Sequence, residues 1–97
     1  MQVGVCRVVL VLPQNRSLKG KRRILQSLTA RLRNRFNVSV AEVEDNDLWQ
    51  RAVLGISYVS NNSRRSNEVL SQVMGFIQST EGEYGVADYQ VDIVPEF

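Results

Sequence analysis

The fold is decided by residues 2–12, which read QVGVCRVVLVL. Valines at positions 3, 5, 9 and 11 alternate with apolar residues at positions 6, 8, 10 and 12, so a strand formed here has two apolar faces. Such a strand is typical of the centre of a sheet, where both faces contact other parts of the protein. We therefore expect a central strand that ends at Pro13-Gln14-Asn15-Arg16.

A helix is predicted after this strand. Ser17 is a suitable N-cap, because its short side chain can accept a hydrogen bond from a free N–H of the first turn. Arg31 and Arg35 border one edge of the apolar arc of this helix, and Lys19 and Arg23 face outward. Arg22 and Arg33 border the other edge. The arc covers about 120° at ~100° per residue and is formed by Leu18, Ile24, Leu25, Leu28, Leu32 and Phe36.

The remaining elements complete a recognisable order. Alternation over residues 37–44 and 51–60, separated by Asp45-Asn46-Asp47, predicts a β-hairpin. A second helix is predicted from about Ser63 to Thr80, and a last strand over residues 87–94. The order β-α-β-β-α-β is the ferredoxin-like arrangement, and right-handed crossovers place the first and third strands at the centre. We expect one α+β domain over residues 1–97, a four-stranded antiparallel sheet with two helices on one face and an apolar open face suited to a partner or dimer contact.

Composition excludes several classes of site. A chain with one cysteine and no histidine has no intramolecular disulfide, no Cys/His zinc cluster and no His-based nucleophile. No apolar run reaches the ~18 residues of a membrane helix, and the apolar N-terminal segment lacks the basic start and cleavage site of a signal peptide. We therefore expect a cytoplasmic protein without membrane contact, cofactor or metal. Cys6 is interpreted as a small buried hydrophobe, and the acidic pairs Glu42/Glu44 and Asp45/Asp47 as solvated hairpin charge.

Charge is divided along the chain. Residues 1–41 contain nine Arg and Lys and no acid, whereas residues 42–97 contain three Arg and ten Asp or Glu, so a net charge of +2 conceals blocks of +9 and −7. No acid within the first helix can pair with its cations, and a local field of this kind attracts phosphate. The alternative is a solvated helix face balanced by the acidic hairpin. The candidate nucleic-acid-binding residues are Arg16, Lys19, Lys21, Arg22, Arg23, Arg31, Arg33 and Arg35.

The segment Asp47-Leu48-Trp49-Gln50-Arg51 holds the only tryptophan, at or beside the hairpin tip. Trp49 and Arg51 are predicted to contact a protein partner, since both residue types are common interface anchors. Stacking of Trp49 on an RNA base, or packing of its ring against an end of the core, are the alternatives. Asp47 is expected to pair with Arg51 or to cap the turn. The sheet is a poor stacking platform, because the first strand has no aromatic residue and the third offers only Tyr58.

Three segments together resemble the YlxP-like family of small bacterial proteins of unknown function, and the resemblance covers essentially the whole chain. It implies a ferredoxin-like fold. Genes of that family commonly lie among those for transcription elongation, translation initiation and ribosome maturation, which implies RNA- or ribosome-associated work. The family has no established catalytic residues, so none is assigned. Members usually carry an acid where this chain has Gly20, which makes the start of the helix more cationic. The segments are Ser17-Leu18-Lys19-Gly20-Lys21-Arg22, Arg35-Phe36-Asn37-Val38-Ser39-Val40-Ala41-Glu42 and Asp47-Leu48-Trp49-Gln50-Arg51-Ala52.

We therefore expect a non-enzymatic accessory protein that binds structured RNA or a ribosomal particle through the basic face of its first helix, in ribosome maturation or translation. Contacts to phosphate recognise backbone shape more than sequence, so no DNA sequence specificity is expected. The alternative is a homodimeric regulatory or scaffolding module that uses the open sheet face, with or without a small anionic ligand. An enzyme of the acylphosphatase kind shares only the topology, because the Gly-rich phosphate loop is missing.

Overall fold

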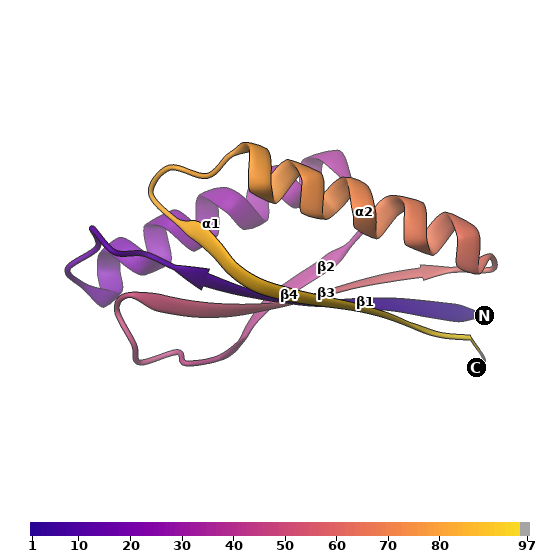
Figure 1. Cartoon of the computed structure of the whole chain (residues 1–97), viewed down its shortest axis with the longest axis horizontal. Helices are drawn as coiled ribbons and strands as arrows, with labels where there is room; N and C mark the ends of the chain where they lie inside the picture. Colours follow the sequence, from indigo (N-terminus) through magenta and orange to yellow (C-terminus); the bar gives the residue numbers. More distant parts are fainter. Residues whose placement is uncertain (96–97) are drawn as a thin grey trace.

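The computed structural model describes residues 1–95, in which two helices lie on one side of a four-stranded antiparallel sheet (Figure 1). The sheet order is β2-β3-β1-β4, so the predicted α+β ferredoxin-like fold is confirmed, with β1 and β3 at the centre. The elements in chain order are β1 (Gln2–Val11), α1 (Leu18–Arg35), β2 (Ser39–Glu44), β3 (Arg51–Ser60), α2 (Ser63–Ser79) and β4 (Gly85–Val94).

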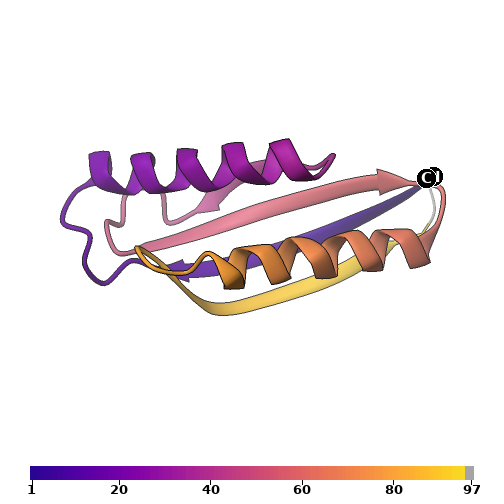
Figure 2. The same cartoon turned by 90° about the horizontal axis from the view of Figure 1, so that it is seen from above.

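The core lies between the sheet and the helices. Figure 2 shows α1 above the side of the sheet that carries β2, and α2 above the side that carries β4. The alternation along β1 decides which residues face the helices, because successive side chains of a strand point to opposite faces. Its buried helix-facing residues meet the apolar arcs of both helices. This cluster includes Cys6, Val8, Leu10, Leu12, Ile24, Leu25, Leu28, Leu32, Leu70, Val73, Met74 and Ile77.

Both helices begin at capping residues. The Ser17 hydroxyl accepts a hydrogen bond of 2.9 Å from the backbone N–H of Gly20, which confirms the predicted start of α1. At α2 the side chain of Asn62 accepts from the N–H groups of Arg64 and Arg65. Neither helix of residues 1–95 is long and apolar enough to cross a membrane.

The hairpin between β2 and β3 is irregular near its tip. Glu42 pairs with Leu54 and Glu44 with Val53, so Val43 is an extra residue in β2. A Cβ atom at Gly55 would lie 2.9 Å from Cγ1 of Val43, and the missing side chain at Gly55 therefore leaves room for this valine. Asp45 then reverses the chain with a positive φ of 59°.

The face of the sheet opposite the helices is not covered by any element of residues 1–95. Val9 and Val53 are nevertheless buried there, and the side chains of Arg7 and Glu44 form an ion pair across this face. Around them lies an open hollow of about 460 Å³ with apolar walls, and more exposed valines surround it. The predicted open apolar face is therefore present.

Candidate nucleic-acid interface

Three cations at the start of α1 are free to meet a ligand. Arg16 lies in the loop before the helix, and Lys19 and Arg22 lie in its first turns, all with exposed side chains. Within residues 1–95 none of the three forms an ion pair or a side-chain hydrogen bond. We call Arg16, Lys19 and Arg22 the free cation cluster.

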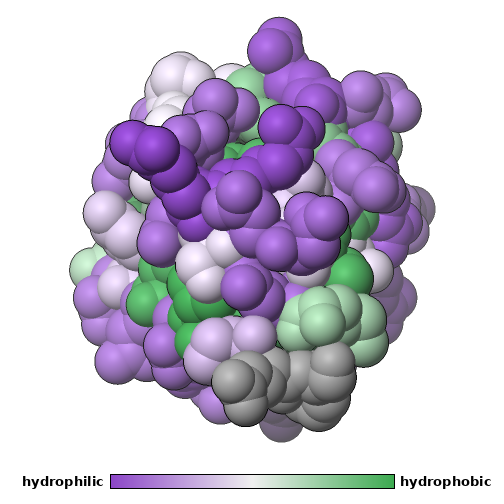
Figure 3. Space-filling model, turned by 90° about the vertical axis from the view of Figure 1, so that its right-hand side faces the viewer, coloured by the Kyte–Doolittle hydropathy of each residue, from purple (hydrophilic) through white to green (hydrophobic). Residues whose placement is uncertain are grey.

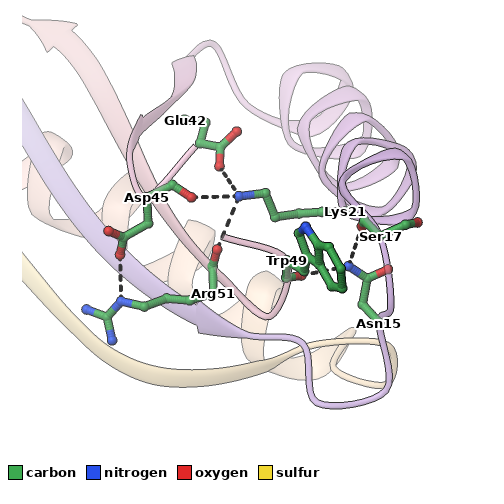
Figure 4. A network of polar contacts seen from close by, with 7 residues as sticks. All are labelled: Asn15, Ser17, Lys21, Glu42, Asp45, Trp49 and Arg51. Atoms are coloured by element: carbon green, nitrogen blue, oxygen red, sulfur yellow. Dashed lines mark hydrogen bonds and ion pairs between the residues drawn. The ribbon is translucent and has the colours of Figure 1, made fainter. Parts of the chain in front are cut away.

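Lys21 must be removed from the predicted phosphate-binding set, because its side chain is only 1 % exposed. Its Nζ lies 2.7 Å from Oε2 of Glu42 and donates hydrogen bonds to the carbonyls of Asp45, at 2.8 Å, and Arg51, at 3.2 Å (Figure 4). That carboxylate oxygen has no hydrogen-bond partner in residues 1–95 besides this ionic contact. The ammonium group therefore fastens the first turn of α1 to the β2–β3 hairpin.

Arg23 is exposed but has an acidic partner that follows α2. Its Nη2 lies 2.6 Å from Oε2 of Glu83, in the loop before β4. This hydrogen bond, together with the attraction of opposite charges, raises the pKa of Arg23 and lowers the pKa of Glu83. Both side chains are mostly exposed, so the pair adds little to stability. Its main effect is to neutralise one cation of the predicted phosphate surface.

The three arginines of the second half of α1 lie on two different sides of the helix. Arg33 donates from Nη2 to the carbonyl of Val40 at 2.9 Å, on the side of β2. Arg35 places its guanidinium 4.6 Å from the ring centre of Phe76, on the side of α2, which is a cation–π contact. Nε of Arg31 donates to the carbonyl of Ser27 in its own helix, at 3.4 Å. All three side chains are exposed. Arg33 lies on the β2 side of α1, whereas Arg31 and Arg35 lie on the α2 side.

At the hairpin tip the partner of Arg51 is Asp45 rather than the predicted Asp47, with Nε 2.6 Å from Oδ2. The bulge in β2 and the positive φ of Asp45 explain the difference, because they turn this side chain towards the start of β3. Trp49 is 53 % exposed and so does not cap an end of the core. Partner contact and base stacking remain as its predicted roles.

Two amides that the sequence did not single out connect the loop before α1 with the hairpin. Nδ2 of Asn15 donates to the carbonyl of Trp49 at 2.6 Å and to that of Ser17 at 2.7 Å (Figure 4). Nε2 of Gln50 returns hydrogen bonds to the carbonyls of Pro13 and Asn15. A Cβ atom at position 20 would lie 2.2 Å from Oδ1 of Asn15, so Gly20 provides the space in which this amide lies. In the sequence, the signal for this contact was Gly20, the glycine within the basic segment Ser17-Leu18-Lys19-Gly20-Lys21-Arg22.

The thiol of Cys6 is buried in the core on β1. Burial raises the pKa of Cys6 to about 11, so its thiol stays protonated and inert at neutral pH, as predicted for a small buried hydrophobe. No group of three or more Cys, Asp or Glu side chains in this part of the chain is placed to hold a metal ion.

Comparison with known proteins agrees with the resemblance noted in the sequence. Residues 3–91 match the family described as "Protein of unknown function (DUF503)". The chain is also 35 % identical, over 77 residues, to "Uncharacterized protein YlxP" of Bacillus subtilis (strain 168), a match that spans 79 % of this chain and 84 % of the relative. The family match thus takes in both helices, the hairpin and nearly all of the sheet. This chain therefore belongs to the DUF503 family, as a relative of YlxP.

Proposed function

We propose that this protein is a non-enzymatic cytoplasmic accessory factor that binds structured RNA, in a ribosomal particle or its precursor, through the outward side of α1. The free cation cluster carries the proposal. Three exposed cations without an acidic partner have no structural task in residues 1–95, and cations at a helix start disfavour the helix through its macrodipole. Their placement is understandable if they bind an anion.

The surroundings of the cluster suit a phosphate. A shallow hollow at the start of α1 is lined by Ser17, Lys19, Gly20, Arg22, Arg23 and Gln26. Arginine can hold a phosphate with two parallel hydrogen bonds, and lysine supplies a compact charge. The helix is 18 residues long, roughly 27 Å at its usual rise, and Arg33 continues the cationic side beyond Arg22. A surface of this length can contact several phosphates of a folded RNA without reading its sequence.

A salt titration tests the proposal. The logarithm of the affinity for a ribosomal RNA fragment should fall linearly with the logarithm of salt concentration, with ~0.7–0.9 of slope for each phosphate contact. The variant Arg16→Glu/Lys19→Glu/Arg22→Glu should lose most of the affinity and reduce the slope by about two to three such contacts. Acidic residues favour a helix start, so the variant should stay folded.

A matched control is Arg64→Glu, which reverses an exposed cation at the start of α2. Helices α1 and α2 begin at opposite ends of the molecule (Figure 1). Arg64→Glu should leave the salt dependence nearly unchanged. If the triple variant binds RNA with the same affinity and slope as the unchanged protein, the proposal is wrong.

A homodimeric regulatory or scaffolding role is the second candidate, favoured by the open sheet face. Val5 and Val43, which line its hollow, are 38 % and 52 % exposed, and Val11, Val59 and Val94 of the same sheet are 37 % to 57 % exposed. Figure 3 views the end of the molecule near the termini, where hydrophilic residues cover the helix side and hydrophobic residues show in smaller patches below them. Sedimentation at micromolar concentration tests this role. A dimer that Val59→Asp dissociates would support it, and a monomer would count against it.

A further inference from the structure

The hairpin tip presents a large aromatic ring to solvent. Trp49 is 53 % exposed although tryptophan is on average one of the more buried residue types. Beside it is an open hollow of about 420 Å³, lined by Asp47, Leu48, Trp49, Gln50 and Arg51. An exposed ring next to a hollow lies where a ligand can contact it.

The backbone that carries this ring is held firmly. Besides the two hydrogen bonds of Asn15, the carbonyl of Gln50 accepts from the N–H of Leu12 at 2.9 Å. Lys21 holds the carbonyls of Asp45 and Arg51, one on each side of the turn. A ring on a fixed backbone loses little conformational freedom when it binds, and pre-organisation of this kind favours affinity.

The same contacts bring the ring close to the free cation cluster. One amide nitrogen, Nδ2 of Asn15, bridges the carbonyls of Trp49 and Ser17, and Arg16 lies between Asn15 and Ser17 in the chain. In Figure 4 the indole of Trp49 lies beside Asn15 at the start of α1. The ring of Trp49 and the start of α1, which carries the cations, therefore lie at the same end of the molecule.

The charges at this end decide which part of a nucleotide would occupy which place. Asp47 lines the hollow and its side chain has no ion pair or hydrogen bond within residues 1–95, so it repels phosphate there but can accept a hydrogen bond from an N–H group on the Watson–Crick edge of a base. Arg16 and Lys19, on the α1 side, attract phosphate. A nucleotide therefore fits with its base at Trp49 and its backbone towards α1.

We infer that Trp49 is a stacking platform for one unpaired RNA base, whose flanking phosphates bind Arg16 and Lys19. The inference rests on the proposed RNA binding and specifies it: the RNA must offer a single-stranded nucleotide, such as a loop or bulge, next to the phosphates that α1 holds. Stacking on an aromatic ring tolerates every base, so the preference is for an unpaired nucleotide rather than a particular sequence.

Fluorescence of the only tryptophan tests the inference directly. The probes are a short oligouridylate and a chain of the same length and charge that lacks bases. The oligouridylate should quench the fluorescence of Trp49 and bind more tightly, and the baseless chain should bind without quenching. The variants of Trp49 lack the tryptophan signal, so their affinity is measured by fluorescence anisotropy of end-labelled probes. Trp49→Ala should weaken binding of the oligouridylate by about 5- to 150-fold, the range for loss of one stacking ring, and leave the baseless chain unaffected. Trp49→Phe should retain most of the affinity.

Tyr89→Ala is the matched control, because Tyr89 on β4 is also an exposed aromatic residue, at 45 %, but does not line this hollow. Its affinity for oligouridylate should stay unchanged. Equal binding of both probes without quenching, abolished by reversal of the free cation cluster, would overturn stacking and leave phosphate binding intact. Trp49 would then be a protein-contact residue. If neither probe nor a folded ribosomal RNA fragment binds, the proposed function itself fails, and the inference fails with it.

Discussion

Replacing Lys21 with methionine should destabilise the protein strongly. Methionine keeps most of the apolar stem but removes an ammonium group that contacts Glu42 and two backbone carbonyls. Loss of one partner from a fully buried ion pair costs ~3–5 kcal/mol. Glu42 is 20 % exposed and can gain water, so we expect a loss of about 2–3 kcal/mol in the free energy of unfolding.

Urea unfolding followed by circular dichroism measures this loss, and the melting temperature should fall by roughly 10–20 °C for a domain of this size. Lys19→Met is the control, because Lys19 is an exposed lysine in the same turn of helix, and its change should stay within about 0.5 kcal/mol. The double variant Lys21→Met/Glu42→Gln should recover roughly half of the loss, since the unpaired charge disappears while two carbonyls still lack a donor. If Lys21→Met unfolds within about 0.5 kcal/mol of the unchanged protein, the ammonium group does not fasten α1 to the hairpin.

Two further predictions concern charges elsewhere in the molecule. Glu83→Gln should release Arg23 for phosphate and increase the slope of log affinity for RNA against log salt concentration by up to ~0.7–0.9. An unchanged slope in the same titration would show that Arg23 does not reach the RNA. Burial raises the pKa of Cys6 from 9.0 to about 11, so the folded state keeps its proton where the unfolded state loses it. This stabilisation is complete below about pH 9 and is lost towards about pH 11, so the free energy of unfolding should decline over that range. Cys6→Ala should make the decline less steep. Urea unfolding at several pH values measures it. Parallel declines for the two proteins would contradict the assignment to Cys6.

Most of the fold could be predicted because its signals are local and repeated. The two apolar faces of residues 2–12 place β1 at the centre, and the serine at position 17 marks the start of α1. The order of elements then leaves few topologies once crossovers are right-handed. The bulge at Val43 was missed, because an extra residue in a short edge strand leaves the alternation nearly intact.

The candidate site was predicted less completely, because contacts between distant segments decide which cations are free. The burial of Lys21 could have been predicted from its position on the helix. At ~100° per residue it lies only about 20° from Leu28, in the middle of the apolar arc, but as a charged residue it was assigned to the exposed face. Arg23 had no such signal, since its partner Glu83 is 60 residues away in a loop. The exposure of Trp49 also depends on tertiary contacts, because a hairpin tip can either fold back on the core or stand in solvent.

Gly20 has a consequence for how this protein can change over evolution. Because a side chain at position 20 would collide with the amide of Asn15, the two positions cannot vary independently. An acid introduced there by a single substitution displaces Asn15 and releases the backbone of Trp49, so the cost appears at the hairpin rather than at the mutated site. Positions 15 and 20 are thus coupled, whereas the residue at position 49 is not, because Asn15 contacts only its backbone carbonyl.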